Sequence, residues 1–390
     1  MHMGKYQHLK FVERTGTNSM KWDWLQQQFG RSDLLAAWVA DMDIEAPACV
    51  RDALRDLVDF NVFGYYRAPE SYYDAFMAWE REQHGYLIQR EWIRHIPGVV
   101  PGLYWAVSMF TEPGEAVAVM TPVYYPFMNA IKDTGRCMVD IPLVLRDGMY
   151  TMDLDGFEKA VTECDVKLFI LCSPHNPVGR VWTKEELRGV LDICKQHGVY
   201  VVSDEIHHDL IMPGNTHVVS AMVGDYDDVL ITLLSASKTF NLAGCMQAFA
   251  VIADEALRNR FDAFLKEIRL GYGTPFGYVA YEAAYRGGLP WLQELLQLIW
   301  DNYCILTEGL GEALPKATVT PLQGTYLAWV NVGAYLDGCD VEATVIDTCD
   351  LALDFGPWFG GEAYGDYVRI NLATSPKTVR EIVRRLSLMR

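Results

Sequence analysis

The feature that most constrains the fold of this chain is a repeated alternation of short apolar runs with longer amphipathic segments between residues 115 and 252. Five of the apolar runs have the length and composition of buried strands. They are residues 116–120, 167–172, 199–203, 229–234 and 247–252. Residues 124–134 and 183–197 have helical periodicity, and the second segment opens on the capping pattern Thr183-Lys184-Glu185-Glu186. This alternation predicts an α/β fold with a mainly parallel sheet covered by helices on both faces.

After residue 253 the pattern changes to long helices and then to a mixture of short strands and helices. We expect helices at residues 255–268, 275–286, 289–314, 341–351 and 375–389, and strands at residues 326–332 and 367–372. We therefore predict a large domain of residues 46–288 and a smaller C-terminal α+β domain of residues 289–390. The N-terminal segment, residues 1–45, has no sheet pattern of its own, and we expect it to pack with the small domain.

Charge and hydropathy exclude several classes of protein. The chain of 390 residues has 33 lysines and arginines against 51 aspartates and glutamates, a net charge of −18. Such a surface repels nucleic acid and anionic membranes, so any phosphate site must be local. No apolar run approaches a membrane span, and residues 1–19 lack the apolar core of a signal peptide. The nine cysteines have no zinc-type spacing, and we interpret them as reduced core residues of a cytoplasmic protein.

Lys238 is the first candidate for chemistry. It follows the apolar run 229–234 and lies in the segment Ser235-Ala236-Ser237-Lys238-Thr239. A lysine that forms a Schiff base needs a fixed position, partial desolvation and nearby donors that can hold a phosphate, and Ser235 and Ser237 can be such donors. A solvated lysine in a serine-rich turn is the alternative interpretation of the same pattern.

Asp204 comes directly after another predicted strand, in Asp204-Glu205-Ile206-His207-His208. At the end of a buried strand its carboxylate can reach a ligand and keep a pyridine nitrogen protonated. The alternatives are a solvated loop and a metal site. Strand alternation divides the four potential metal ligands of this segment between two faces, so we expect no metal here.

Two loops add candidate contacts. Asn176 lies between two prolines in Pro174-His175-Asn176-Pro177, after the run 167–172, where its amide can donate to a phenolic oxygen. Residues 97–102 precede an apolar helical stretch at 103–110, and backbone amides at that helix start can face an anion. Either loop alone is also compatible with an ordinary turn.

Taken together and in this order, these segments resemble the fold-type I pyridoxal-phosphate enzymes of the aminotransferase class I/II superfamily. Further segments resemble the MalY/PatB cystathionine β-lyase branch, and the similarity runs across essentially the whole chain. They are residues 16–23 (GTNSMKWD), 38–43 (WVADMD), 63–66 (FGYY), 121–127 (TPVYYPF) and 203–207 (SDEIH).

The resemblance implies a role for each matching residue. Lys238 would hold the cofactor covalently, Asp204 would pair with its ring nitrogen, Asn176 would bond its phenolic oxygen and Tyr124 would stack on its ring. The phosphate would be held by Ser235, Ser237, the amides of Val99 and Val100, and Tyr65 of the neighbouring subunit in a homodimer. Arg369 would bind the substrate α-carboxylate with two donors; without the resemblance, a surface arginine on an edge strand would be the simpler interpretation.

The chain departs from the wider superfamily at two places. Where many of those aminotransferases have a phosphate-binding arginine shortly after the lysine, this chain has Gly244-Cys245-Met246-Gln247. Where they often have a tyrosine three residues after the aspartate, it has His207, which can contact the phenolic oxygen or simply pack. The charge of a bound phosphate must therefore be balanced in another way.

The resemblance implies a pyridoxal-phosphate-dependent carbon–sulfur β-lyase that cleaves cystathionine or cysteine S-conjugates to a thiol, pyruvate and ammonia. Two other functions remain open from the residues. An aminotransferase would use the same cofactor residues but return the proton to the cofactor carbon. A non-catalytic protein of the same fold would bind a partner instead, although the presence of Lys238, Asp204 and Asn176 disfavours it.

Overall fold

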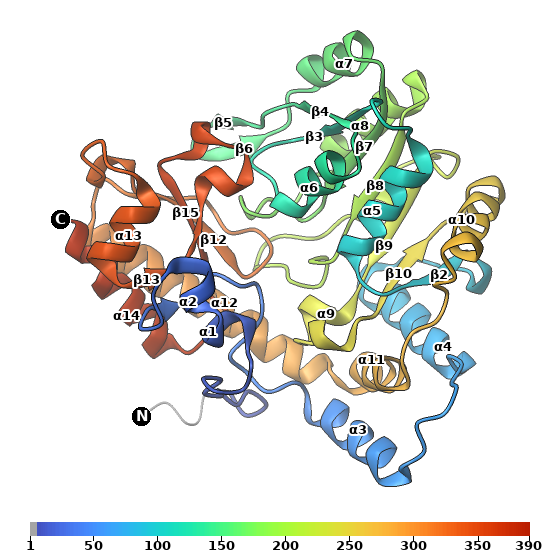
Figure 1. The fold of residues 1–390 in the computed structure, drawn as a ribbon, viewed down its shortest axis with the longest axis horizontal. Coiled ribbons are helices and arrows are strands. Elements are labelled where there is room, and N and C mark those ends of the chain that lie inside the picture. Colours follow the sequence, from blue (N-terminus) through green and yellow to red (C-terminus); the bar gives the residue numbers. More distant parts are fainter. Residues whose placement is uncertain (1–5) are drawn as a thin grey trace.

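The computed structural model describes residues 6–390, which form a seven-stranded sheet, a four-stranded sheet and two pairs of short strands, together with helices (Figure 1). The strands of the seven-stranded sheet lie in the order β2 (Ile93–Ile96), β10 (Ala248–Val251), β9 (Leu230–Leu234), β8 (Tyr200–Asp204), β7 (Val166–Cys172), β3 (Ala116–Val119) and β4 (Cys137–Asp140). Neighbouring strands from β9 to β4 are parallel, and only β10 runs antiparallel to its two neighbours. The predicted α/β class and the mainly parallel sheet are therefore confirmed.

Helices bury both faces of this sheet. Alternate residues of the strands pack against α5 (Val99–Phe110), α6 (Tyr125–Asp133) and α10 (Glu255–Ile268) in one apolar cluster. The intervening residues pack against α7 (Leu154–Glu163) and α8 (Lys184–His197), or against α4 (Glu70–Trp79) and α11 (Pro275–Gly287) near β10. Because successive side chains of a strand point to opposite faces of the sheet, each strand contributes to separate hydrophobic cores on the two faces. The capping box predicted for α8 is present between Thr183 and Glu186.

The small sheet is antiparallel and lies beside the large one (Figure 1). Its strands lie in the order β11 (Thr318–Val319), β12 (Leu327–Asn331), β15 (Tyr367–Asn371) and β14 (Asp354–Phe355). The long helix α12 (Leu289–Ala313) packs against α14 (Pro376–Leu386), and α13 (Val341–Cys349) lies near the C-terminal end. The domain boundaries at residues 45 and 288 stay a prediction.

The N-terminal segment departs from expectation in one respect. After α1 (Met20–Asp23) and α2 (Leu25–Phe29), the strand β1 (Leu35–Ala36) pairs in parallel with β13 (Leu351–Ala352), although the sequence indicated no strand here. Two residues are too few to show a strand period, so the pairing could not be seen in the sequence. Arg31, in the same segment, donates to Asp350 Oδ1 at 2.6 Å.

Several elements had no counterpart in the sequence interpretation. They are α3 (Ala48–Phe60), α4, the short helix α9 (Ala236–Thr239), strands β2 and β4, and the hairpin of β5 (Val144–Arg146) and β6 (Met149–Thr151). The cysteines also need a correction. All nine are free thiols, but Cys137, Cys164 and Cys339 are exposed rather than in the core. None of the helices described within residues 6–390 has the length and apolar content needed to cross a bilayer.

Candidate active site

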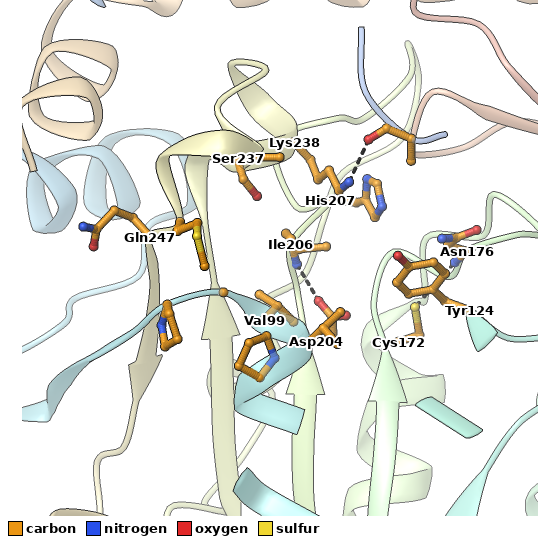
Figure 2. Close-up of a pocket in the computed structure, with 17 residues that line it drawn as sticks. Val99, Tyr124, Cys172, Asn176, Asp204, Ile206, His207, Ser237, Lys238 and Gln247 are labelled. Carbon is orange, nitrogen blue, oxygen red and sulfur yellow. Dashed lines mark hydrogen bonds between the residues drawn. The ribbon is translucent and has the colours of Figure 1, made fainter. Parts of the chain in front are cut away.

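A cavity of about 180 Å³ lies at the carboxyl ends of the parallel strands (Figure 2). The strand order brings four predicted residues to this edge: Lys238 follows β9, Asp204 ends β8, Asn176 follows β7 and Tyr124 follows β3. All four line the cavity. Parallel strands end at the same edge of a sheet, so residues far apart in sequence converge there.

The N-terminus of α5 closes one end of the cavity. Because β2 and β9 are both antiparallel to β10, β2 also ends at this edge, and the chain then enters α5 through Gly98. Val99, Val100 and Ser237 line the same space. The first N–H groups of a helix have no intrahelical acceptor and attract anions. This end of the cavity is therefore suited to a phosphate.

Ser235 does not line the cavity, in contrast to Ser237. Its buried hydroxyl contacts the hydroxyl of Tyr281 at 2.9 Å and the carbonyl of Gln247 at 2.8 Å. Ser235 Oγ also lies 3.0 Å from Ser237 Oγ and accepts the backbone N–H of Ser237 at 3.1 Å. In this arrangement Ser235 orients Ser237 from behind the cavity wall.

Lys238 is buried, and burial lowers the pKa of its amine to about 8. Its Nζ donates to the carbonyl oxygen of Ala40 at 2.7 Å (Figure 2). The hydroxyl of Tyr326 donates to the same oxygen at 2.7 Å. The adjacent Asp41 carboxylate partly opposes the fall in pKa. The N-terminal segment 38–43 thus holds the amine in place, a contact that nothing in the sequence indicated.

Asp204 is buried at the end of β8, where desolvation raises the pKa of its carboxyl to about 7. The backbone N–H of Ile206 donates to Asp204 Oδ1 at 3.0 Å and opposes this rise, as does the positive charge of Lys238. A second cationic partner inside the cavity would stabilise the ionised carboxylate further.

Arg369 and Asn176 form the opposite side of the site. Arg369 lies on β15, which has strands on both sides and is not an edge, and its guanidinium is buried. It donates to Asn176 Oδ1 at 3.0 Å and to the Trp38 carbonyl at 3.0 Å, and it pairs with Asp354. Since the Asn176 oxygen is occupied by Arg369, its Nδ2 is the group free to donate.

Asp354 is a residue that the sequence interpretation missed. It lies opposite Arg369 in the register of β14 and β15, and burial raises the pKa of its carboxyl to about 6, while Arg369 opposes this rise. One of its oxygens and the Nε of Arg369 have no partner. Only the pairing of β14 with β15 brings Asp354 and Arg369 together, so no local sequence pattern could have identified Asp354.

His207 and Tyr65 occupy contrasting positions. His207 lines the cavity with its ring packed edge-on to Tyr326, and burial holds its pKa well below the usual value, so the ring is neutral. Tyr65 is fully exposed and lies outside the cavity of its own chain. Among the described residues that line the cavity, Lys238 is the only lysine or arginine.

The comparisons with known proteins cover nearly the entire chain. Residues 39–386 match the sequence model of the aminotransferase class I and II family. The chain is 38% identical to cystathionine β-lyase PatB of Bacillus subtilis (strain 168), over 97% of this chain and 98% of that protein. It is 32% identical to protein MalY of Escherichia coli (strain K12), over 93% of each. Its fold matches cystalysin from Treponema denticola, whose structure contains a pyridoxal 5'-phosphate cofactor, with a TM-score of 0.93, 34% identity and 98% of each chain covered.

Proposed function

The chain belongs to the aminotransferase class I and II family, in the MalY/PatB branch, and from this membership we propose that it is a pyridoxal-phosphate-dependent carbon–sulfur β-lyase. Its substrate is cystathionine or a related cysteine S-conjugate, which reacts with water to give a thiol, pyruvate and ammonia. The observation that supports this most strongly is the pairing of a full-length similarity to a cystathionine β-lyase with a buried lysine and aspartate in one cavity.

The residues of the cavity fit pyridoxal phosphate. A buried amine at Lys238 suits its aldehyde, a buried carboxylate at Asp204 suits its ring nitrogen, and the free amide of Asn176 suits its phenolic oxygen. The start of α5 and the Ser237 hydroxyl offer neutral donors to the phosphate. When bound, the cofactor supplies an electron sink for negative charge at the substrate Cα.

We propose that Lys238 moves the proton of the reaction. Its pKa of about 8, against an ordinary value of 10.5, leaves roughly a tenth of the amine neutral at pH 7, and neutral Nζ can accept the Cα proton of the substrate. With the cofactor bound, the Asp204 carboxylate would accept the ring N–H and keep that nitrogen protonated. The Tyr124 ring, which lines the same cavity, would cover the cofactor ring and exclude water from it.

Arg369 binds the substrate α-carboxylate in this proposal. Its Nε has no partner, and its pairing with Asp354 holds the guanidinium in the site. An incoming carboxylate competes with Asp354 for the same donors. Asp354 can release the guanidinium of Arg369 by taking up a proton, because burial already raises the pKa of its carboxyl.

The cofactor phosphate is balanced by helix N–H groups, Ser237 and the Tyr65 hydroxyl of a second subunit in a homodimer. The exposed Tyr65 supports this assignment, since it is too far from the cavity of its own chain to line it. Nine unbonded cysteines suit a reducing compartment, and we place the enzyme in the cytoplasm.

The test is to incubate the purified enzyme with cystathionine in the absence of any keto acid. A β-lyase releases homocysteine, pyruvate and ammonia in equal amounts and continues over many turnovers. An aminotransferase stops after one turnover, accumulates pyridoxamine phosphate and resumes only when a keto acid is added. Absence of both reactions with cystathionine and with S-alkyl cysteines would favour the non-catalytic alternative.

A further inference from the structure

A second cluster of ionisable side chains lies behind the cavity, on the opposite side of the segment that follows β8. It contains three carboxylates and three histidines: Glu80, Glu205, Asp209, His84, His208 and His217. Every one of these side chains is at least nine-tenths buried. None of the reaction steps proposed above uses any of them.

Three of these residues are arranged as metal ligands. Glu80 and His84 lie on one turn of the π-helix Glu80–His84 that continues α4, and His208 faces them from the segment after β8. One ligand atom from each lies within 4.8 Å of the others, and Glu80 Oε1 is 3.0 Å from His208 Nε2. In a tetrahedral zinc site with bonds of about 2.1 Å, ligand atoms are roughly 3.4 Å apart. The observed spacing needs only small side-chain shifts to match it.

The neighbouring groups orient these ligands as outer contacts do in metal sites. His208 Nδ1 is 2.7 Å from the backbone carbonyl of Glu205, so it carries the hydrogen and leaves Nε2 for an ion. His84 Nε2 is 2.7 Å from Asp209 Oδ1, and Thr239 donates to the other Asp209 oxygen at 2.7 Å. Asp209 therefore holds Nε2, and Nδ1 is the His84 atom that would bind an ion. Histidine ligands backed by a carbonyl or a carboxylate are the usual pattern around zinc.

Two further observations point to a ligand. Glu80 Oε2 is completely buried and has no hydrogen-bond donor, which is costly for a carboxylate oxygen. A separate cavity of about 270 Å³ is lined by His84, His208 and His217, and the backbone side of His84 reaches the surface. An ion therefore has a route to the three side chains.

We propose that Glu80, His84 and His208 bind one Zn²⁺ ion, with water as the fourth ligand. The sequence led us to expect no metal, because alternation separates the ligand types around Asp204. That separation holds, since His207 lines the cofactor cavity and His208 does not. The missing partners come from Glu80 and His84, more than 120 positions earlier in the chain. The ion would link the end of α4 to the segment between β8 and Lys238.

The test is Co²⁺ binding to chelator-treated holoenzyme, with Co²⁺ as a spectroscopic substitute for Zn²⁺. We expect one Co²⁺ per chain, a visible spectrum typical of tetrahedral coordination, and displacement by one equivalent of Zn²⁺. Loss of a residue that only orients a metal ligand typically weakens metal binding about 10- to 100-fold. Glu80→Gln and His208→Gln, which remove ligands, should each weaken Co²⁺ binding by more than that. The matched control is His197→Gln on α8, a histidine paired with Glu158 at 3.2 Å but with no third ligand, which should bind as the unchanged protein does.

The proposal is overturned if the unchanged protein binds no stoichiometric Co²⁺ or Zn²⁺, or if both variants bind as tightly as it does. The cofactor absorbance reports whether each variant has folded. If neither variant folds, crystals of the unchanged protein soaked in Co²⁺ decide the question by anomalous scattering. A peak between Glu80, His84 and His208 supports the site, and a peak elsewhere or no peak rejects it.

Discussion

Burial tunes the two central residues in opposite directions. Desolvation lowers the pKa of Lys238 to about 8 and raises the pKa of Asp204 to about 7, because each loses water around its charged form. The two groups therefore have similar proton affinities before any cofactor binds. A positively charged ring nitrogen beside Asp204 would separate them again, since it stabilises the ionised carboxylate.

The first prediction concerns the covalent attachment at Lys238. Borohydride reduction of the unchanged protein should fix the cofactor to the chain, whereas Lys238→Ala should retain none after reduction and denaturation, because within residues 6–390 no other lysine lines the cavity. Mass spectrometry of the digested protein gives the answer. Lys132→Ala, at an exposed lysine of α6, is the control and should behave as the unchanged protein. A fixed cofactor in Lys238→Ala would refute the assignment.

The second prediction is that Asp204→Asn keeps the cofactor but loses roughly 100-fold or more in turnover, because the neutral amide cannot hold the ring nitrogen protonated. Cofactor absorbance and the rate of pyruvate release measure the two effects separately. Turnover close to that of the unchanged protein would exclude this role for Asp204.

Asp204 also predicts a pH dependence of stability in the cofactor-free protein. A carboxyl whose folded pKa is about 7, against an ordinary 3.8, contributes stability that is complete below pH 3.8 and is lost as pH rises to about 7. Relative to the unchanged protein, apo Asp204→Asn should gain stability over that window, by at most about 4 kcal/mol, and the difference should be constant above it. Urea unfolding at several pH values measures this, and a difference that does not vary with pH would contradict the pKa assignment.

Sequence reasoning located site residues where a local pattern identified them. Lys238, Asp204, Asn176 and Tyr124 each follow a predicted strand, and all four line one cavity. Asp354 and the Ala40 carbonyl could not be found in this way, because strand register and a distant loop bring them to the site. The separation of Ser235 from the cavity is likewise set by tertiary contacts.

At the scale of elements, burial on both faces decided which strands could be predicted. Strands β3, β7, β8 and β9 are buried along almost their whole length, and they were expected within one or two residues of their ends. The edge strand β4 is mostly exposed and gives no such signal. Likewise β2 contains Arg94 and His95, and only its long-range pairing with β10 makes it a strand.

The fourth prediction concerns helix α8. Thr183 Oγ1 accepts the N–H of Glu186 at 3.1 Å, and the Glu186 carboxylate accepts the N–H of Thr183 at 2.9 Å. Thr183→Ala should lower the free energy of unfolding by about 1 kcal/mol while leaving turnover unchanged, because the cap is distant from the cavity. Thr183→Ser should restore most of the loss. Equal stability of all three proteins in urea would show that the cap contributes nothing.

At the scale of the molecule, one edge of the large sheet concentrates the functional groups while the surface carries a net charge of −18. The negative electrostatic field of this surface repels phosphate, so hydrogen-bond donors in the cavity have to outweigh that repulsion. Among the described residues that line the cavity, Lys238 is the only cationic side chain and Asp204 the only carboxyl group, so one chain provides an incomplete site for the phosphate. A second subunit can complete it.

The last prediction is therefore an obligate dimer with shared sites. Between α3 and α4 the chain exposes a run of large apolar side chains, and one of them, Phe63, stacks on Phe276 at 5.7 Å. The residues are Phe60, Val62, Phe63, Tyr65 and Tyr66. A patch of this kind on a large protein is typical of an interface. It places the Tyr65 hydroxyl where another subunit can use it.

Mixing two defective proteins tests this directly. A Tyr65→Ala subunit cannot supply the hydroxyl that contacts the phosphate in its partner's site. A Lys238→Ala subunit lacks the lysine that holds the cofactor in its own site. After unfolding and refolding together, mixed dimers should contain one site with both native residues, and up to a quarter of all sites should recover activity, since random pairing makes half the dimers mixed. Refolding each variant alone is the control. Sedimentation should give a dimer throughout, and a monomer with full activity, or no recovery in the mixture of two folded variants, would reject shared sites.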